Sequence, residues 1–397
     1  MKKSETKIIC ILLVLILGFF GGTATFRPEA EAAQPNVPAL SIPDVGDSLT
    51  EPGDSDQSPA DPQQGEAPNP EDITPPTEES PAPPAESEYF TVNMIGDCTL
   101  ASVSYYQGTP QGYDTVINGD WAYPFSLTAD MFADDDMTFA NLECSLTDSN
   151  NRTDKTFTFK CDPDYANIMV EGNVEFVTLA NNHVLDYGQE GYDDTKAALD
   201  AVGVGYAGRD EYAVYETESG LRVGVYALSF GTVSQVNAGI AALKELDPDF
   251  IIAAMHWGDE GSYTVNSDQI TLAHACIDAG ADFVYGSHPH TLQPYEVYKD
   301  KYIYYSMGNW TFGGNTDPRD NDTFILRLTL EKTPDGEVSV IEREHIPAAC
   351  SGVENGNDYR PVLYEDGSEE YKRVLSKLDG SFTGQNLSIG YEYSANE

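Results

Sequence analysis

Five short motifs hold the residues of this 397-residue chain that are best suited to chemistry. They are Gly96-Asp97, Asn141-Leu142-Glu143, Ala180-Asn181-Asn182-His183, His256-Trp257-Gly258 and Gly286-Ser287-His288-Pro289-His290. The chain has six histidines, and four of them lie in these motifs. Imidazole and carboxylate groups are ligands that Zn, Mn and Fe ions take from proteins. The motifs therefore predict a divalent-metal site, provided that they meet in space.

Apolar runs rich in β-branched and aromatic residues precede these motifs and recur along the chain. The predicted strands are Tyr89–Ile95, Met137–Leu142, Val174–Leu179, Arg222–Leu228, Phe250–Met255, Asp282–Tyr285, Tyr302–Ser306, Phe324–Leu330 and Val338–Glu344. Amphipathic patterns predict helices at Gln189–Val202 and Ser267–Ala279. Strands that alternate with helices indicate an α/β fold with a largely parallel sheet. After Tyr295 the strands follow one another without helices, which favours antiparallel pairing and a second, mixed sheet. We therefore expect two packed sheets flanked by helices.

Ligands of open α/β sheets gather at the carboxyl ends of the strands. Asp97 follows the first predicted strand and Glu143 the second. Asn182 and His183 follow the third, His256 follows the fifth, and the His288/His290 pair follows the sixth. A single Asp after a strand is usually a turn or a helix cap, and a single His is usually structural. Together, however, they predict one shared site.

The two ends of the chain have different compositions. Lys2, Lys3 and Lys7 precede an apolar run at Ile8–Phe20, so residues 1–32 read as a signal peptide or an N-terminal membrane anchor. Residues 33–88 hold many Pro, Asp and Glu but no Lys or Arg, which predicts a disordered acidic linker. We expect a folded domain at 89–347. A C-terminal extension at 348–397 would follow, in which a helix at Ser368–Leu378 covers the core.

The formal net charge of −45 excludes the nucleic-acid-binding class, because phosphate backbones require Lys and Arg. The N-terminal pattern places the folded part on the extracellular face of the cell membrane or in the secreted fraction. Outside the cytoplasm a disulfide between Cys144 and Cys161 is one possible pairing of the cysteines. Cys98 and Cys276 are predicted to be buried apolar residues. His274 and His345 have no motif around them and read as structural.

From Tyr89 to about Thr311 the chain resembles the CapA family of poly-γ-glutamate capsule synthesis proteins. The carrying stretches are Met94-Ile95-Gly96-Asp97, Ala140-Asn141-Leu142-Glu143, Leu179-Ala180-Asn181-Asn182-His183-Val184-Leu185-Asp186-Tyr187-Gly188, Met255-His256-Trp257-Gly258, Ala279-Gly280-Ala281-Asp282, Gly286-Ser287-His288-Pro289-His290-Thr291-Leu292-Gln293 and Tyr305-Ser306-Met307-Gly308-Asn309-Trp310. The family is similar to calcineurin-like metallophosphoesterases. This implies a four-layer α/β/β/α sandwich with two mixed sheets.

The wider resemblance implies a role for each motif residue. Metal ligands for one or two ions of Mn, Zn or Fe would be Asp97, Glu143, Asn182, His256, His288 and His290. Glu143 stands where a bridging aspartate is expected. His183 would assist the leaving group, and Asp186 would orient it, although their spacing also suits a simple turn. Asn181, Asn309 and Glu260 would support the ligands from behind.

The chain departs from the metallophosphoesterase pattern shortly after Asp97. Thr99 stands two residues after Asp97, where these enzymes have a histidine ligand. Two functions therefore stay open for a protein of capsule or poly-γ-glutamate biosynthesis and export. One is an accessory protein that binds an anionic extracellular polymer beside capsule-synthesis membrane proteins. The other is a metal-dependent hydrolase of that polymer, cleaving a phosphoester or a γ-glutamyl amide.

Overall fold

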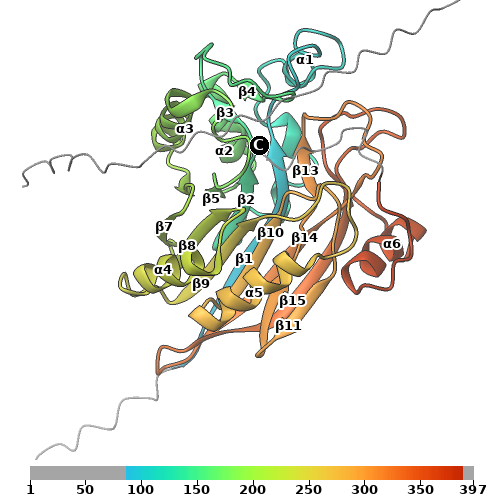
Figure 1. The fold of residues 1–397 in the computed structure, drawn as a ribbon. Helices are drawn as coiled ribbons and strands as arrows, with labels where there is room; N and C mark the ends of the chain where they lie inside the picture. Colours follow the sequence, from blue (N-terminus) through green and yellow to red (C-terminus); the bar gives the residue numbers. More distant parts are fainter. Residues whose placement is uncertain (1–85, 388–397) are drawn as a thin grey trace, which may run out of the picture. The chain divides into compact units, whose positions relative to one another are not determined.

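The computed structural model describes residues 86–387 (Figure 1). The predicted leader or anchor at 1–32, and all but the last three residues of the predicted linker at 33–88, lie outside the described residues. Within the described part, no helix combines the length and apolar character needed to cross a bilayer. The boundary at residue 347 between domain and extension stays a prediction.

The first sheet has eight strands in the order β16-β15-β14-β1-β2-β5-β6, with β13 paired to β1. Its strands are β1 (Glu88–Thr99), β2 (Met137–Leu142), β5 (Phe176–Thr178), β6 (Gly205–Ala207), β13 (Asn309–Phe312), β14 (Asp322–Lys332), β15 (Val338–Ala349) and β16 (Val362–Leu363). The strands β1, β2, β5, β6 and β13 are parallel, whereas β14, β15 and β16 are antiparallel to their neighbours. The first sheet is therefore mixed.

The second sheet has six strands in the order β11-β12-β10-β9-β8-β7. Its strands are β7 (Glu211–Glu216), β8 (Arg222–Ser229), β9 (Phe250–His256), β10 (Phe283–Ser287), β11 (Tyr295–Tyr298) and β12 (Lys301–Tyr304). The four central strands are parallel and both edge strands are antiparallel. A small separate sheet pairs β3 (Ser145–Leu146) with β4 (Lys160–Cys161).

Three apolar clusters separate four layers of structure. The helices are α1 (Tyr113–Ile117), α2 (Asn167–Glu171), α3 (Gly188–Val202), α4 (Val233–Lys244), α5 (Ser267–Ala279) and α6 (Glu369–Leu378), with short 3₁₀ turns at Tyr123–Phe125, Ala129–Met131 and Pro163–Ala166. One cluster joins α2 and α3 to the outer face of the first sheet. The second lies between the two sheets, and the third joins α4 and α5 to the second sheet. The predicted α/β/β/α sandwich with two mixed sheets is confirmed.

Alternation along single strands explains these clusters. In β8, Val223 and Val225 face the first sheet while Tyr226 and Leu228 face the helices. Successive side chains of a strand point to opposite faces, so an uninterrupted apolar run has to be covered on both sides. The central strands of both sheets are built in this way.

Two glycines allow the backbone to cross from one sheet to the other. A Cβ atom at Gly96 would lie 2.1 Å from the Gly308 carbonyl oxygen, and one at Gly286 would lie 2.2 Å from the Tyr305 carbonyl oxygen. The Asp97 N–H donates to the Gly308 carbonyl at 2.8 Å. The segment that leaves β12 and enters β13 thus packs directly on the strand ends that carry the motifs.

Several predictions from the sequence need correction. Helix α4 and strand β7 were not expected, although Thr232 caps α4 and Gln235 completes a capping box. Asp97 lies inside β1 rather than after it, because β13 extends the pairing of β1 to this level. Cys144 and Cys161 are free thiols, so the disulfide is not formed; pairing of β3 with β4 already closes this loop.

Candidate metal centre

Ligand-type side chains from both sheets converge at the carboxyl ends of their strands. Asp97 and Glu143 come from the first sheet, and His256, His288 and His290 from the second. In each of three groups, one ligand atom per residue lies within 4.8 Å of the others: Glu143-His256-His288, Asp97-Glu143-His290 and Glu260-His288-His290. The shared edge predicted from the sequence therefore exists.

Glu143 belongs to two of these groups and is fully buried. Neither of its carboxylate oxygens accepts a hydrogen bond from a described residue, and its nearest ion-pair contact is His256 Nε2 at 3.5 Å. A buried carboxylate without hydrogen bonds is costly unless a cation binds it. The donor set and this unsatisfied group fit a divalent ion, with Glu143 in a position to bridge two.

The pKa shifts of the buried groups also agree with a divalent-metal site. Burial raises the pKa of the Glu143 carboxyl well above its usual range. Burial also lowers the pKa values of His256 and His288 well below the usual value, so both imidazoles are neutral, as metal ligands must be. Burial alone would lower the pKa of His290, but the carboxylates of Glu143 and Asp97 raise it to about 10. Metal uptake at His290 must therefore release a proton.

Asp97 is held by a chain of amide side chains. Its Oδ1 accepts from Asn141 Nδ2 at 2.9 Å, and Asn141 Oδ1 accepts from Asn181 Nδ2 at 3.0 Å. Asn181 also donates to the Leu142 carbonyl at 2.8 Å and accepts from the His183 N–H at 3.1 Å. Asn181 thus ties two motifs together. This hydrogen bond from Asn141 to Asp97 was not predicted, although Asn141 lies in one of the motifs. Asn141 is on the same face of its strand as Phe139.

Asn182 and His256 meet on the other side of Glu143. His256 Nε2 lies 2.9 Å from Asn182 Oδ1, and its Nδ1 lies 2.9 Å from Ser287 Oγ. The Ser287 hydroxyl orients the ring so that Nε2 points to the centre, the arrangement that groups behind a metal ligand usually provide.

His183 and Asp186 form a buried pair beside the centre. His183 Nδ1 lies 2.7 Å from Asp186 Oδ2, and the same oxygen accepts the Phe159 N–H at 2.8 Å. Lys155 Nζ lies 3.5 Å from Asp186 Oδ1. Because Asp186 is fixed by these contacts, it sets the orientation of the imidazole. The predicted side-chain contact between His183 and Asp186 is present, so the two residues do more than form a turn.

Backbone strain gathers at the same place. His288 has φ of 98° and His290 has φ of 55°, both in the region that side-chain-bearing residues rarely adopt. Such conformations cost of order 1–3 kcal/mol each and persist at sites where the surroundings impose them. The strained turn after β10 therefore sets the directions of the His288 and His290 imidazole rings.

Asn309 and Glu260 complete the surroundings. Asn309 Oδ1 lies 2.9 Å from His290 Nδ1, and Asp97 Oδ2 lies 3.2 Å from the same nitrogen. Glu260 shares a ligand group with His288 and His290. A supporting role was predicted for Asn309 without a named partner, and its contact is with His290. Glu260, also predicted to support the ligands, lies among the candidate ligands themselves.

Three phenylalanines border the centre and were not expected there. Phe159 packs edge-on against His183 with ring centroids 4.6 Å apart, Phe312 lies 4.7 Å from His290, and Phe230 lies 4.9 Å from His288. Phe230 is 53% exposed and has φ of 46°. Nothing in its local sequence marks it, because its position depends on how β8 ends against the other strands.

The residues outside the motifs behave as structural groups. Thr99 is buried, and its hydroxyl makes no hydrogen bond with any described residue. His274 stacks on Tyr298 and contacts Glu296 at 2.9 Å, away from the centre. His345 Nε2 lies 2.6 Å from the Tyr304 hydroxyl.

Comparison with known proteins agrees with the motifs. The family model described as "Bacterial capsule synthesis protein PGA_cap" matches residues 91–314. The PGA biosynthesis protein CapA of Bacillus subtilis (strain 168) is 31% identical over 323 residues, which cover 75% of this chain and 82% of that protein. The capsule biosynthesis protein CapA of Bacillus anthracis is 30% identical over 310 residues, covering 66% of this chain and 72% of that protein.

Among solved structures, the NAD nucleotidase of Haemophilus influenzae matches with a TM-score of 0.40 at 13% identity, covering 74% of this chain and 63% of that one. The resemblance drawn from the sequence is confirmed by the family model and the curated relatives. The chain belongs to the CapA-type bacterial capsule synthesis proteins, the PGA_cap family.

Proposed function

We propose that this protein binds a pair of divalent ions of Mn, Zn or Fe around Glu143 and hydrolyses an anionic capsule polymer such as poly-γ-glutamate. The observation that carries the proposal is the sharing of Glu143 by two ligand groups, with both of its oxygens buried and without hydrogen bonds from described residues. When bound, such ions polarise a phosphoryl or carbonyl group toward attack.

His183 is the proton donor in this proposal. The Asp186 carboxylate accepts a hydrogen bond from Nδ1, which leaves Nε2 to hold the proton that the leaving group needs. His183 also lines a pocket together with His290 and Asn309. A substrate in that pocket would lie beside both the proton donor and the candidate ligands.

A second candidate function is binding of the polymer without turnover. It is favoured by Thr99, which stands where metallophosphoesterases carry a histidine ligand. One ion would then be held by fewer groups than the other. For both functions we propose that the protein lies outside the cytoplasm, at the membrane or secreted, beside capsule-synthesis membrane proteins. The basic and apolar N-terminal sequence supports this location.

The experiment combines metal analysis with turnover on the purified full-length protein. We expect Mn, Zn or Fe to co-purify or to load at up to two ions per chain, and cleavage of bis-p-nitrophenyl phosphate or of poly-γ-glutamate. His183→Ala should keep the metal and lower turnover about 10²- to 10⁴-fold, because the ion ligands remain and only the proton donor is lost.

A matched control is His274→Ala, which removes a histidine from the surface of α5. It should change neither metal content nor turnover. Metal-loaded wild type with no turnover would refute the hydrolase and leave the binding function. Equal turnover in wild type and His183→Ala would refute the proton-donor role of His183. A protein that takes up none of the three metals would refute the proposed metal centre.

A further inference from the structure

The turn after β10, residues 288–290, carries two of the candidate ligands, and a neighbouring segment between β9 and α5 holds it. We call residues 288–290 the ligand turn. The Gly261 N–H of the neighbouring segment donates to the Pro289 carbonyl at 2.7 Å. The Ser262 carbonyl accepts from the Thr291 hydroxyl at 2.9 Å. These two contacts lie on either side of the last residue of the ligand turn, so together they fix its course.

The ligand turn needs such support because its backbone is strained. His288 and His290 both have positive φ, and residues with side chains keep such a conformation only where the surrounding structure imposes it. The contacts from Gly261 and Ser262 are therefore part of what directs the two imidazoles to the centre.

The segment that holds the ligand turn is itself held by the C-terminal end of the described chain. We call residues 379–387, which follow α6, the C-terminal strap. The Leu387 N–H donates to the Gly261 carbonyl at 2.9 Å, and the Tyr263 N–H donates to Asn386 Oδ1 at 2.9 Å. Gly261 is thus hydrogen-bonded to the C-terminal strap through its carbonyl and to the ligand turn through its N–H.

Helix α6 anchors the beginning of the C-terminal strap. The Phe382 N–H donates to the Ser376 carbonyl at 2.9 Å, and the Phe382 ring packs edge-on against Tyr263 with ring centroids 4.9 Å apart. Lys377 Nζ lies 4.9 Å from the centroid of the Tyr263 ring and 5.1 Å from that of Phe382. The C-terminal strap therefore begins from a packed cluster.

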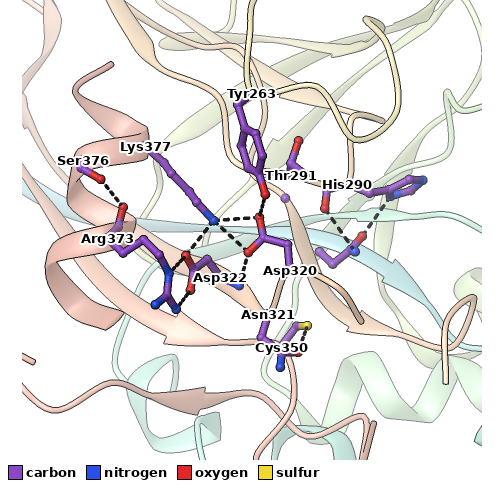
Figure 2. A network of polar contacts seen from close by, with 12 residues as sticks. Tyr263, His290, Thr291, Asp320, Asn321, Asp322, Cys350, Arg373, Ser376 and Lys377 are labelled. Carbon is purple, nitrogen blue, oxygen red and sulfur yellow. Dashed lines mark hydrogen bonds and ion pairs between the residues drawn. The ribbon is translucent and has the colours of Figure 1, made fainter. Parts of the chain in front are cut away.

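A buried ionic network joins α6 to the same segment (Figure 2). Lys377 Nζ lies 2.8 and 2.7 Å from the two oxygens of Asp320 and 2.7 Å from Asp322 Oδ2. Arg373 contacts both oxygens of Asp322 at 2.7 Å. The Tyr263 hydroxyl donates to Asp320 at 2.8 Å. Tyr263 is therefore held at its hydroxyl by the network and at its N–H by the C-terminal strap.

All three layers line the pocket beside the centre. Leu387 of the C-terminal strap, Gly261 and His290 belong to its lining, and its volume is about 200 Å³. None of the five sequence motifs includes a residue of α6 or of the C-terminal strap. This support of the ligand turn therefore comes from a part of the chain to which the motifs assign no role.

We propose that the C-terminal strap is a positioning element of the metal centre. Through Gly261 and Tyr263 it holds the ligand turn in the strained conformation that presents His290 to an ion. The inference rests on the proposed function, because it takes His290 as a metal ligand. When the contacts of the C-terminal strap are lost, the ligand turn relaxes and an ion at His290 binds less tightly.

Matched variants of the full-length protein test this. N386A removes the acceptor of the Tyr263 N–H, N386D keeps an oxygen there, and L387P removes the N–H that the Gly261 carbonyl accepts. In titrations with MnCl₂, affinity should fall about 5-fold in N386A and about 10-fold or more in N386A/L387P, since one or two hydrogen bonds to the segment are lost. N386D should bind Mn as wild type does. So should the control Q385A, because Gln385 is an exposed neighbour on the C-terminal strap.

Hydrogen exchange in EDTA gives a second readout that needs no metal. The peptides that span residues 257–263 and 286–293 should exchange faster in N386A/L387P than in wild type, while the rest of the protein stays protected.

The inference is overturned if N386A/L387P binds Mn as wild type does or leaves exchange of the ligand turn unchanged. It is also overturned if N386D loses as much affinity as N386A, or if exchange rises throughout the protein. Wild type that takes up no Mn would count against the proposed function instead, and exchange in EDTA would then decide alone whether the C-terminal strap holds the ligand turn.

Discussion

Replacing Glu143 by glutamine should change the stability of the protein in opposite directions with and without metal. The side chain is fully buried, and no described residue donates a hydrogen bond to its oxygens. Without an ion, the protein must either bury this carboxyl in its charged form or protonate it above its ordinary pKa, and both cost free energy. Glutamine has nearly the same shape and no charge, so E143Q removes that requirement.

The magnitude follows from the cost of protonation. The ordinary pKa of a glutamate is 4.5. Keeping such a group neutral at pH 7.5 costs about 1.4 kcal/mol per pH unit, hence about 4 kcal/mol at most. The nearby His290 cation, which attracts the charged form, reduces this cost. We expect E143Q to be more stable than wild type by about 1–3 kcal/mol in the presence of chelator, a rise in Tm of roughly 2–10 °C.

With metal the order should reverse. An ion present at a thousand times its Kd stabilises the folded state by about 4 kcal/mol. E143Q damages both ligand groups that share this residue, so most of that gain should be lost. The assay is thermal unfolding in EDTA and in MnCl₂, with E342Q as control because Glu342 is exposed on β15. An equal Mn-induced rise in Tm in E143Q and wild type would refute the role given to Glu143.

Three further predictions concern the stability of the fold. Lys377→Met should lower the free energy of unfolding by about 3–5 kcal/mol, since it leaves buried Asp322 without one of its cations; chemical denaturation within 1 kcal/mol of wild type would contradict this. Burial raises the pKa of Glu175 to about 7, so deprotonation of the folded state is penalised as pH rises from about 4.5. Glu175→Gln should therefore match wild type at pH 4 and exceed it by about 2 kcal/mol at pH 8.5, and a pH-independent difference would count against this. Gly96→Ala should cost about 3 kcal/mol or more and weaken Mn uptake, because its Cβ would meet the Gly308 carbonyl; a normal Tm would show that the segment gives way freely.

Much of the fold was open to prediction because it follows from local patterns. The apolar runs of β1, β2, β9 and β10 predict strands, and the polar residues at the ends of these strands predict the shared edge. Carboxyl ends of parallel strands meet at one edge, so Glu143 and His288 could be assigned to one site without knowing which strands pair.

What stayed hidden depends on register and on contacts far apart in the chain. Asn141 supports Asp97 only because β1 and β2 align these two residues as partners. Phe230 reaches His288 because the chain turns with positive φ after β8. The crossing of the chain from β12 to β13 brings Asn309 beside His290; a supporting role was predicted for Asn309, but its partner was not, because no local signal announces such a crossing.

The division of the candidate ligands between the two sheets has a mechanical consequence. Asp97 and His288 are 191 positions apart in the chain and belong to different sheets, yet they lie in direct contact. An ion bound between such groups would cross-link the two sheets at one rim, as a disulfide links two segments of a chain. At the opposite rim the sheets are joined without a metal, because Lys332 at the end of β14 lies 2.8 Å from Asp249 just before β9. Removing the ion would then let the sheets part first at the edge that carries the candidate ligands, so one bound ion would complete the site and hold that edge of the fold together.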